Sequence, residues 1–254
     1  MAITIKSERE IELMAEAGKI LERVHNELEK ALRPGMSTKD IDTLGEEIIR
    51  SYGCIPSFLN YNGYPASICV SVNQEVVHGI PDKHRIIQEG DIVSLDAGVI
   101  YKGYHSDAAR THAVGEVSEE AKKLIQLTKE SFFEGIKFAK AGNHLFDISG
   151  AIGRYAEERG YGVVRDLCGH GIGTALHEAP EIPNYEVGRK GVRLRPGMTL
   201  AIEPMINIGT HEVDWLDDDW TVVTRDGSLS AHYENTILIT EGEPRILSLT
   251  CENE

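Results

Sequence analysis

Two aspartates, Asp96 and Asp107, are spaced so that they could hold a cation between them. Each lies in a run with the period-2 alternation of a β-strand, residues 92–99 and 104–114. A two-residue turn at 102–103 would join the runs into a hairpin, in which Asp107 is the diagonal neighbour of Asp96 on the same face, about 7–8 Å away. Because two carboxylates on one face repel each other unless a cation lies between them, this hairpin is a candidate metal site.

Three further candidate ligands lie in the second half of the sequence. His170 stands between glycines in the run 169–173, Glu203 ends an apolar run, and Glu234 lies in an alternating run. Taken alone, each has a simpler structural explanation, which is a turn for the histidine and a solvated strand face for the glutamates. Taken together with the two aspartates, they form a set of four carboxylates and one imidazole: Asp96, Asp107, His170, Glu203 and Glu234.

The charge of this set indicates its chemistry. Four ionised carboxylates in one pocket would raise one another's pKa, whereas two divalent cations would cancel the four negative charges. Oxygen-rich ligation with one imidazole suits Mn, Fe, Co or Zn, and the residue types do not choose among them. Two metals about 3.5–4 Å apart can share one water and lower its pKa to about 7, so the set favours hydrolysis at neutral pH.

Helices and strands on both sides of the hairpin must position these ligands. Capping residues and apolar spacing predict helices over about residues 8–32 and 37–53, then a helix that begins after Ser118 and another that ends at Gly160. A strand is predicted over residues 67–72. Residues 220–225 and 228–239 are predicted to form a second hairpin around an Asp-Gly turn, with Glu234 in its second strand.

Landmarks of the first half recur 107 positions later. The helix-breaking segment 33–35 corresponds to segment 140–142. The run 89–96 corresponds to the run 196–203, which aligns Asp96 with Glu203. Common helix-loop-helix-strand patterning is the alternative explanation. If the repeat is real, one catalytic domain over residues 1–254 consists of two halves, about 1–116 and 117–254, related by an approximate two-fold.

The composition is that of a globular protein with an acidic balance. The chain has 254 residues, 41% hydrophobic and 26% charged, with a net charge of −15, which argues against a nucleic-acid or anionic-membrane partner. Four scattered cysteines without a C-x-x-C spacing favour a reducing compartment. No apolar signal core or membrane-length run is visible, so we expect a cytoplasmic protein.

The motifs around the candidate ligands resemble type I methionine aminopeptidase, and the resemblance covers essentially the whole chain. It implies an α+β "pita-bread" fold, with two pseudo-symmetric halves and a curved antiparallel sheet covered by helices. It also implies a metal-dependent aminopeptidase that removes the N-terminal methionine of nascent polypeptides when the second residue is small, using a hydroxide that bridges two divalent metals. The motifs are residues 94–98 with Asp107, 169–173, 177–180, 202–204 and 233–236.

By this resemblance, each ligand has an expected role at two divalent ions, which could be Co, Mn, Fe or Zn. Asp107 and Glu234 would bridge both metals. Asp96 would bind one metal, and His170 and Glu203 would bind the other.

The resemblance also implies catalytic residues. His78 and His177 would contact the scissile amide, with His177 helping to stabilise the tetrahedral intermediate, and Glu203 would transfer the proton of the bridging water. An N–H of either imidazole can stabilise the charge that develops on the amide oxygen. A monovalent cation beside the backbone of Asn73 and Ser230 is implied as well.

A pocket for the methionine side chain is expected at Tyr61, Tyr64, Cys69 and Trp220. Contacts between sulfur and aromatic edges are favourable by about 0.3–1.5 kcal/mol, although packing within the aromatic loop would explain these residues equally well. Three residues beside this pocket depart from those that we expect in bacterial relatives, and they put the fine substrate preference in question. They are Phe58, Leu176 and Asp219, the last standing where glycine is expected.

Other functions fit the pattern less well. A proline-specific aminopeptidase or dipeptidase of this fold would share the ligands, but we expect an extra N-terminal domain there, and Asp96 comes too early for one. A type II relative would carry a helical insertion between His170 and Glu203. A metal-free binding protein would have lost ligands, and a dinuclear phosphoesterase would need a basic clamp near the motifs. We therefore expect nascent polypeptide N-termini as partners, with the ribosome as a further one, and a monomer without DNA or membrane contacts.

Overall fold

The computed structural model describes residues 2–249 and contains four α-helices at the predicted positions. Their first turns carry the expected caps: the Glu10 carboxylate accepts from the Ser7 N–H at 2.7 Å, and Ser118 accepts from the Ala121 N–H at 3.1 Å. The four predicted helices are thus confirmed, as α1 (Glu8–Ala31), α2 (Thr38–Ser51), α3 (Glu119–Ile136) and α4 (Leu145–Glu157).

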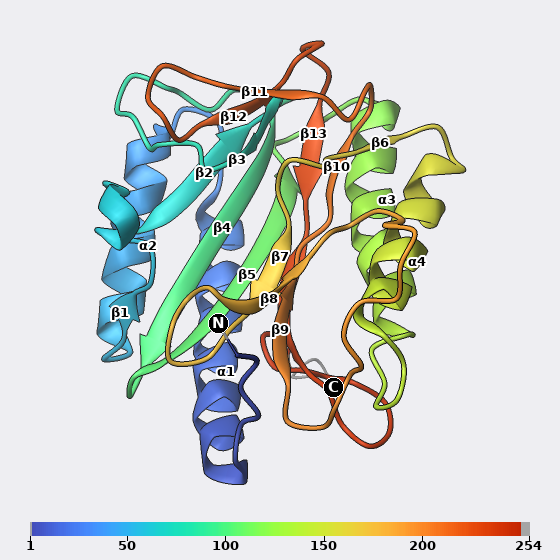
Figure 1. Cartoon of the computed structure of the whole chain (residues 1–254). Coiled ribbons are helices and arrows are strands. Elements are labelled where there is room, and N and C mark those ends of the chain that lie inside the picture. The colour runs from blue at the N-terminus through green and yellow to red at the C-terminus, as the bar shows by residue number, and fades with distance from the viewer. Residues whose placement is uncertain (1, 250–254) are drawn as a thin grey trace.

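A curved antiparallel sheet of nine strands runs through the molecule (Figure 1). Its main path is β1 (Ile55–Pro56), β4 (Ile92–Tyr101), β5 (Tyr104–Ala113), β14 (Glu234–Leu238), β9 (Thr199–Ile202), β7 (Gly169–Gly171) and β8 (Glu178–Ile182). Two further strands pair with this path, β2 (Ile68–Val72) with β4 and β15 (Arg245–Ile246) with β14.

Two three-stranded sheets and a short 3₁₀ helix complete the architecture. One sheet has the order β13 (Ser230–His232), β10 (Met205–Asn207) and β6 (Gly162–Val163). The other has the order β11 (Val213–Trp215), β12 (Val222–Thr224) and β3 (Glu75–Val77), and the 3₁₀ helix spans Tyr61–Gly63.

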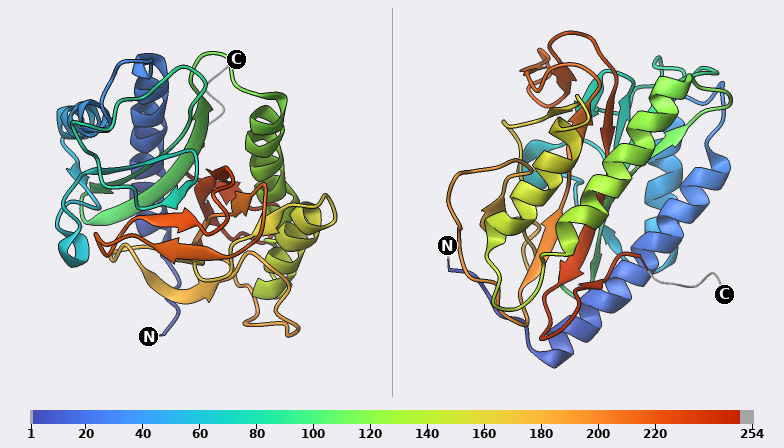
Figure 2. Two further views of the ribbon diagram at one scale, coloured as in Figure 1. Left: turned by 90° about the horizontal axis from the view of Figure 1, so that it is seen from above. Right: turned by 90° about the vertical axis from the view of Figure 1, so that its right-hand side faces the viewer.

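The helices cover the two halves of the sheet separately (Figures 1 and 2). Helices α1 and α2 pack on β2, β4 and β5, around a core that includes Leu21, Ile68 and Leu95. Helices α3 and α4 pack on each other and on the strands of the second half, around a core that includes Phe132 and Ile202. The opposite side of the sheet is free of helices, and this is the side on which the candidate ligands lie.

The central hairpin has the predicted register. Tyr101 faces Tyr104, and Asp107 faces Gly98, which makes it the diagonal neighbour of Asp96. The two turn residues at 102 and 103 have φ values of 48° and 87°, as a type I′ turn requires. The turn therefore fixes which face of the sheet carries the two aspartates.

The second predicted hairpin is wrong. Strand β12 pairs with β11 and β3, whereas β13 pairs with β10, so the two runs belong to different sheets. The Asp226 carboxylate accepts hydrogen bonds from the N–H groups of Thr210 and Ser228, which ties the turn to another loop. The second run also breaks at Tyr233, whose N–H donates to the Pro204 carbonyl at 3.2 Å before β14 enters the large sheet.

Backbone hydrogen bonds recur at the 107-residue offset. Gly35 has φ 90° and donates to the Ile87 carbonyl at 2.9 Å, and Gly142 has φ 94° and donates to the Leu194 carbonyl at 3.0 Å. These matched bonds support the proposal that the halves are repeats within one domain. The isolated β-bridges show the same offset: Ser37 with Ile86, and His144 with Arg193.

The cysteines and the apolar character of the helices bear on the expected compartment. Cys54, Cys69 and Cys168 are free thiols, and Cys251 lies outside the described residues. Among helices within residues 2–249, none combines the length and apolar character that crossing a bilayer needs.

Candidate metal centre

One cavity of about 280 Å³ contains every side chain that the sequence analysis singled out for metal binding, catalysis or the methionine pocket. It is lined by residues from both halves of the chain. The predicted residues that line it are Tyr61, Tyr64, Cys69, His78, Asp96, Asp107, His170, His177, Glu203, Trp220 and Glu234.

Five adjacent strands each bring one candidate ligand to this cavity. In spatial order, β4, β5, β14, β9 and β7 carry Asp96, Asp107, Glu234, Glu203 and His170, with Glu203 directly after the end of β9. The cross-strand partners of these ligands are alanines. Ala109 faces both Asp96 and Glu234, and Ala201 faces His170. Their short side chains leave room for the long ones to converge above the sheet.

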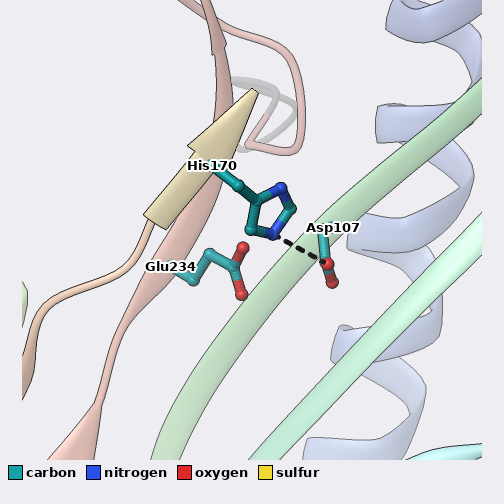
Figure 3. Close-up of side chains that lie close together, drawn as sticks. All are labelled: Asp107, His170 and Glu234. Atoms are coloured by element: carbon teal, nitrogen blue, oxygen red, sulfur yellow. Dashed lines mark ion pairs between the residues drawn. The ribbon is translucent and has the colours of Figure 1, made fainter. Parts of the chain in front are cut away.

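The tightest part of the set consists of Asp107, His170 and Glu234, which each offer a ligand atom within 4.8 Å of the others (Figure 3). The Nε2 atom of His170 lies 3.9 Å from Oδ2 of Asp107 and 3.8 Å from Oε1 of Glu203. Asp96 lies in the same cavity, and the charges of Asp107 and Glu203 affect its pKa. A cation near the middle of this group would be within reach of several ligands at once.

Burial makes the ionised carboxylates costly. Burial raises the pKa of Asp107 to about 7. Burial, with added repulsion from neighbouring carboxylates, raises the pKa of Asp96, Glu203 and Glu234 well above the usual carboxyl range. Three buried oxygens, one each from Asp96, Asp107 and Glu234, have no hydrogen-bond partner. Unpaired buried oxygens of this kind fit divalent cations, which would use those lone pairs as ligands.

His170 has the tautomer that a metal ligand needs. Its Nδ1 lies 2.9 Å from the Gly171 carbonyl oxygen, which can only accept, so Nδ1 carries the proton and Nε2 is left with a lone pair. Burial lowers the pKa of His170 to about 3, which keeps the ring neutral. The free Nε2 lone pair points toward the carboxylates, as the distances to Asp107 and Glu203 show.

The two predicted catalytic histidines lie at the wall of the cavity beside the ligands. The His177 ring lies 4.1 Å from that of His170, and its Nδ1 is 3.1 Å from the Tyr61 hydroxyl. His78 has φ 59° and packs edge-on against Trp220. Burial lowers the pKa of His78 to about 4 and also lowers that of His177. Both rings are therefore neutral N–H donors near neutral pH.

The predicted methionine pocket is an apolar corner of the same cavity. The Tyr64 and Trp220 rings meet edge to face at 5.1 Å, and the Tyr64 hydroxyl donates to the Gly79 carbonyl at 3.0 Å. Cys69 is buried in the same apolar cluster. Two of the unexpected residues, Phe58 and Leu176, also line this corner.

Two peripheral predictions can be placed in the structure. Asp219 has φ 63°, the left-handed region that favours the glycine expected there. The Ser230 N–H donates to the Asn73 carbonyl at 3.0 Å, so these two backbones lie together as the predicted monovalent site requires. The cation itself remains a prediction.

The sequence analysis missed His232 and Lys6. The side chain of His232 is only 2% exposed, and its Nε2 lies 3.7 Å from Oε2 of Glu203. Its position two residues before Glu234 in an alternating run was a signal that could have identified it. Lys6 is buried against the Glu178 carboxylate at 2.6 Å, next to His177 in the chain. No sequence signal links that N-terminal lysine to the site.

Comparisons with known proteins agree with this geometry. The profile of metallopeptidase family M24 matches residues 12–241. The methionine aminopeptidase of Clostridium acetobutylicum is 58% identical over 98% of this chain and 100% of its own, and methionine aminopeptidase 1 of Bacillus subtilis is 51% identical over 94% and 96%. The crystal structure of methionine aminopeptidase from Thermotoga maritima superposes with a TM-score of 0.96 at 47% identity, covering 98% of this chain and 100% of that one.

The raised carboxyl pKa values predict that the metal-free protein loses stability as the pH rises. The unfolded chain releases these protons near the ordinary carboxyl pKa of about 4, whereas folded Asp107 holds its proton to about pH 7. Folding thus takes up protons, and the free energy of unfolding falls between pH 4 and pH 7, by an amount on the order of a few kcal/mol. Calorimetry of the chelated protein should give a lower unfolding midpoint at pH 8 than at pH 5.

Two further measurements separate the effect of the site carboxylates on the pH dependence of the unfolding midpoint from that of other carboxylates. The Asp107→Asn variant has no carboxyl to titrate, so its midpoint should depend less on pH. Added Mn²⁺ should raise the midpoint of the unaltered protein more at pH 8 than at pH 5, because it binds the deprotonated ligands. Identical pH dependence in the two proteins would contradict the assignment of the raised pKa to Asp107.

Proposed function

The chain belongs to metallopeptidase family M24, with methionine aminopeptidases as its relatives, and from this premise we propose how its site removes an N-terminal methionine. The observation that carries the proposal is the convergence of five side chains, from five adjacent strands, on one buried cavity. This cavity also holds two neutral histidines and an apolar corner, which are the parts that hydrolysis of a methionyl peptide bond requires.

Asp96, Asp107, His170, Glu203 and Glu234 would together hold two divalent ions. Two ions balance the charge of four carboxylates, and the buried oxygens without hydrogen-bond partners are available as ligands. When bound, such a pair lowers the pKa of a shared water to about 7 and so supplies a nucleophile at neutral pH. The donor types suit Mn, Fe, Co or Zn.

Glu203 is the residue that would move the proton. Its carboxylate lies at the rim of the ligand group, with Oε1 3.8 Å from His170 Nε2, and burial raises its pKa. A carboxylate with a raised pKa can take a proton from the attacking water and give it to the leaving amine. The same group would therefore act first as general base and then as general acid.

The two histidines would stabilise the amide oxygen. If the Tyr61 hydroxyl donates to Nδ1 of His177, that ring carries its proton on Nε2 and can donate it into the cavity. His78, held against Trp220, would offer a second N–H. Donors fixed before the reaction stabilise the developing negative charge without reorganisation.

Substrate selection would come from the two ends of the cavity. The apolar corner at Tyr64, Cys69 and Trp220 would take the methionine side chain. The carboxylate-rich end suits a free α-amino group, which would restrict cleavage to the first peptide bond. We propose nascent polypeptides as the substrates, which would place the activity in the cytoplasm, with ribosome docking as a further expectation.

Methionine release should require both a divalent metal and the Glu203 carboxylate. We expect chelated protein to be inactive on Met-Ala-Ser, and Mn²⁺ or Co²⁺ to restore turnover. The Glu203→Gln variant should lose about 10²–10⁴-fold in kcat, the usual contribution of a positioned acid–base group, and Glu203→Ala should abolish activity. Glu130→Gln on α3, outside the cavity, is the matched control and should retain it. Full turnover by chelated protein would refute the mechanism.

The second residue of the substrate should be small. We expect cleavage of Met-Ala-Ser but not of Met-Lys-Ser, because the resemblance to methionine aminopeptidases implies a preference for a small second residue. A Xaa-Pro peptide panel, measured at one metal concentration by release of the free amino acid, tests the proline-specific alternative. Equal rates on Met-Ala-Ser and Met-Lys-Ser would show that this size limit is absent.

A further inference from the structure

His232 is a buried histidine that the mechanism above does not use. It ends β13 and precedes Glu234 by two residues. Its backbone is fixed, because its N–H donates to the Thr111 hydroxyl at 2.9 Å and its carbonyl accepts from the same hydroxyl at 2.9 Å. Thr111 is itself 2.8 Å from the Ser94 hydroxyl. The ring is therefore held at one place relative to the sheet.

The ring of His232 faces the carboxylates of the candidate metal centre. Its Nε2 lies 3.7 Å from Oε2 of Glu203 and 3.9 Å from Oε2 of Glu234. Neither ring nitrogen has a hydrogen-bond partner, although the side chain is only 2% exposed. A buried nitrogen left without a partner is costly, so its orientation toward two carboxylates calls for a functional explanation.

The two oxygens of Glu203 face two different imidazoles. Oε1 lies 3.8 Å from Nε2 of His170, on the side of the other ligands. Oε2 lies 3.7 Å from Nε2 of His232. A carboxylate that binds a metal through one oxygen and carries a proton on the other needs a hydrogen-bond donor to orient the second oxygen. His232 is the side chain beside Oε2 of Glu203.

We propose that His232 is a positioning residue, whose Nε2–H orients the free oxygen of Glu203 for proton transfer. This inference rests on the function proposed above, in which Glu203 moves the proton. Such a hydrogen bond requires the 3.7 Å separation of Nε2 and Oε2 to shorten to about 3 Å. The N–H then selects the rotamer in which Oε2 is directed to the reacting water and the leaving amine.

Two rival explanations of His232 make different predictions. If it were a sixth metal ligand, its loss would weaken metal binding. If it only filled space, any side chain of similar volume would serve. The distinguishing feature of a positioning residue is that the N–H donor, rather than the volume or the metal affinity, determines the rate of the chemical step.

The test compares His232→Gln with His232→Leu. Both fill a similar space, but only glutamine keeps an N–H donor at a comparable reach. We expect His232→Leu to lose about 10–100-fold in kcat with little change in KM, the size of effect that partners of metal-site residues show, and His232→Gln to recover most of that loss. Mn²⁺ affinity, measured by calorimetry, should stay within about threefold of the unaltered protein in both variants, whereas loss of a metal ligand would weaken it together with kcat.

His112 provides the matched control. It lines a second cavity together with His232, but its ion pair is with Glu29 on α1, at 3.6 Å, and not with a ligand carboxylate. The His112→Gln variant should therefore keep kcat, KM and Mn²⁺ affinity. Long-range ¹H–¹⁵N NMR of the unaltered protein should find the His232 proton on Nε2, a readout that does not depend on turnover.

Three results would overturn the inference. They are an unchanged kcat in His232→Leu, equal losses in His232→Leu and His232→Gln, and a loss of Mn²⁺ affinity in parallel with kcat. If His232→Leu does not fold, His232→Asn replaces it, since its shorter amide cannot reach Glu203. An active Glu203→Gln enzyme would refute the proposed function as well, whereas an inactive Glu203→Gln with an unaffected His232→Leu would refute only the role of His232.

Discussion

Four carboxylates gathered around one cavity, three of them buried and Glu203 half-buried, are the constraint on which the rest of this structure depends. Within residues 2–249, the ion pairs of Asp107, Glu203 and Glu234 are formed with histidines and not with lysine or arginine. The half-buried Arg110 donates instead to the backbone carbonyls of Ala109 and Glu234. The protein therefore does not neutralise the carboxylates itself. Either they keep their protons, or divalent ions provide the missing charge.

The sheet makes this arrangement possible by bringing distant residues into adjacent positions. Each strand offers one ligand, and strand spacing of about 4.8 Å sets the separation of neighbouring side chains. The proposed repeat explains how the two halves can supply equivalent positions, since Asp96 lies in β4 and Glu203 directly follows β9, at the 107-residue offset. Packing each half on its own pair of helices leaves the ligand face open to substrate.

The sequence predicted the local features well, because short-range chemistry determines them. Turn residues at 102–103 fixed the register of the central hairpin, and caps fixed the helices. The break at Tyr233 was not predictable, because it depends on a bond to Pro204, a residue far away in the chain. His232 was missed for the same reason, since its significance comes from Glu203, which reaches it only after β10 and β13 pair.

The central claim is that the five side chains hold two ions, and a crystal structure of Mn²⁺-loaded protein tests it most directly. An anomalous difference map should show two peaks, both bound by Asp107 and Glu234, with Asp96 on one ion and His170 and Glu203 on the other. Glu203→Ala crystals would provide the comparison, with the peak beside His170 weakened. A map without peaks in this cavity, or with manganese bound only elsewhere on the protein, would contradict the account.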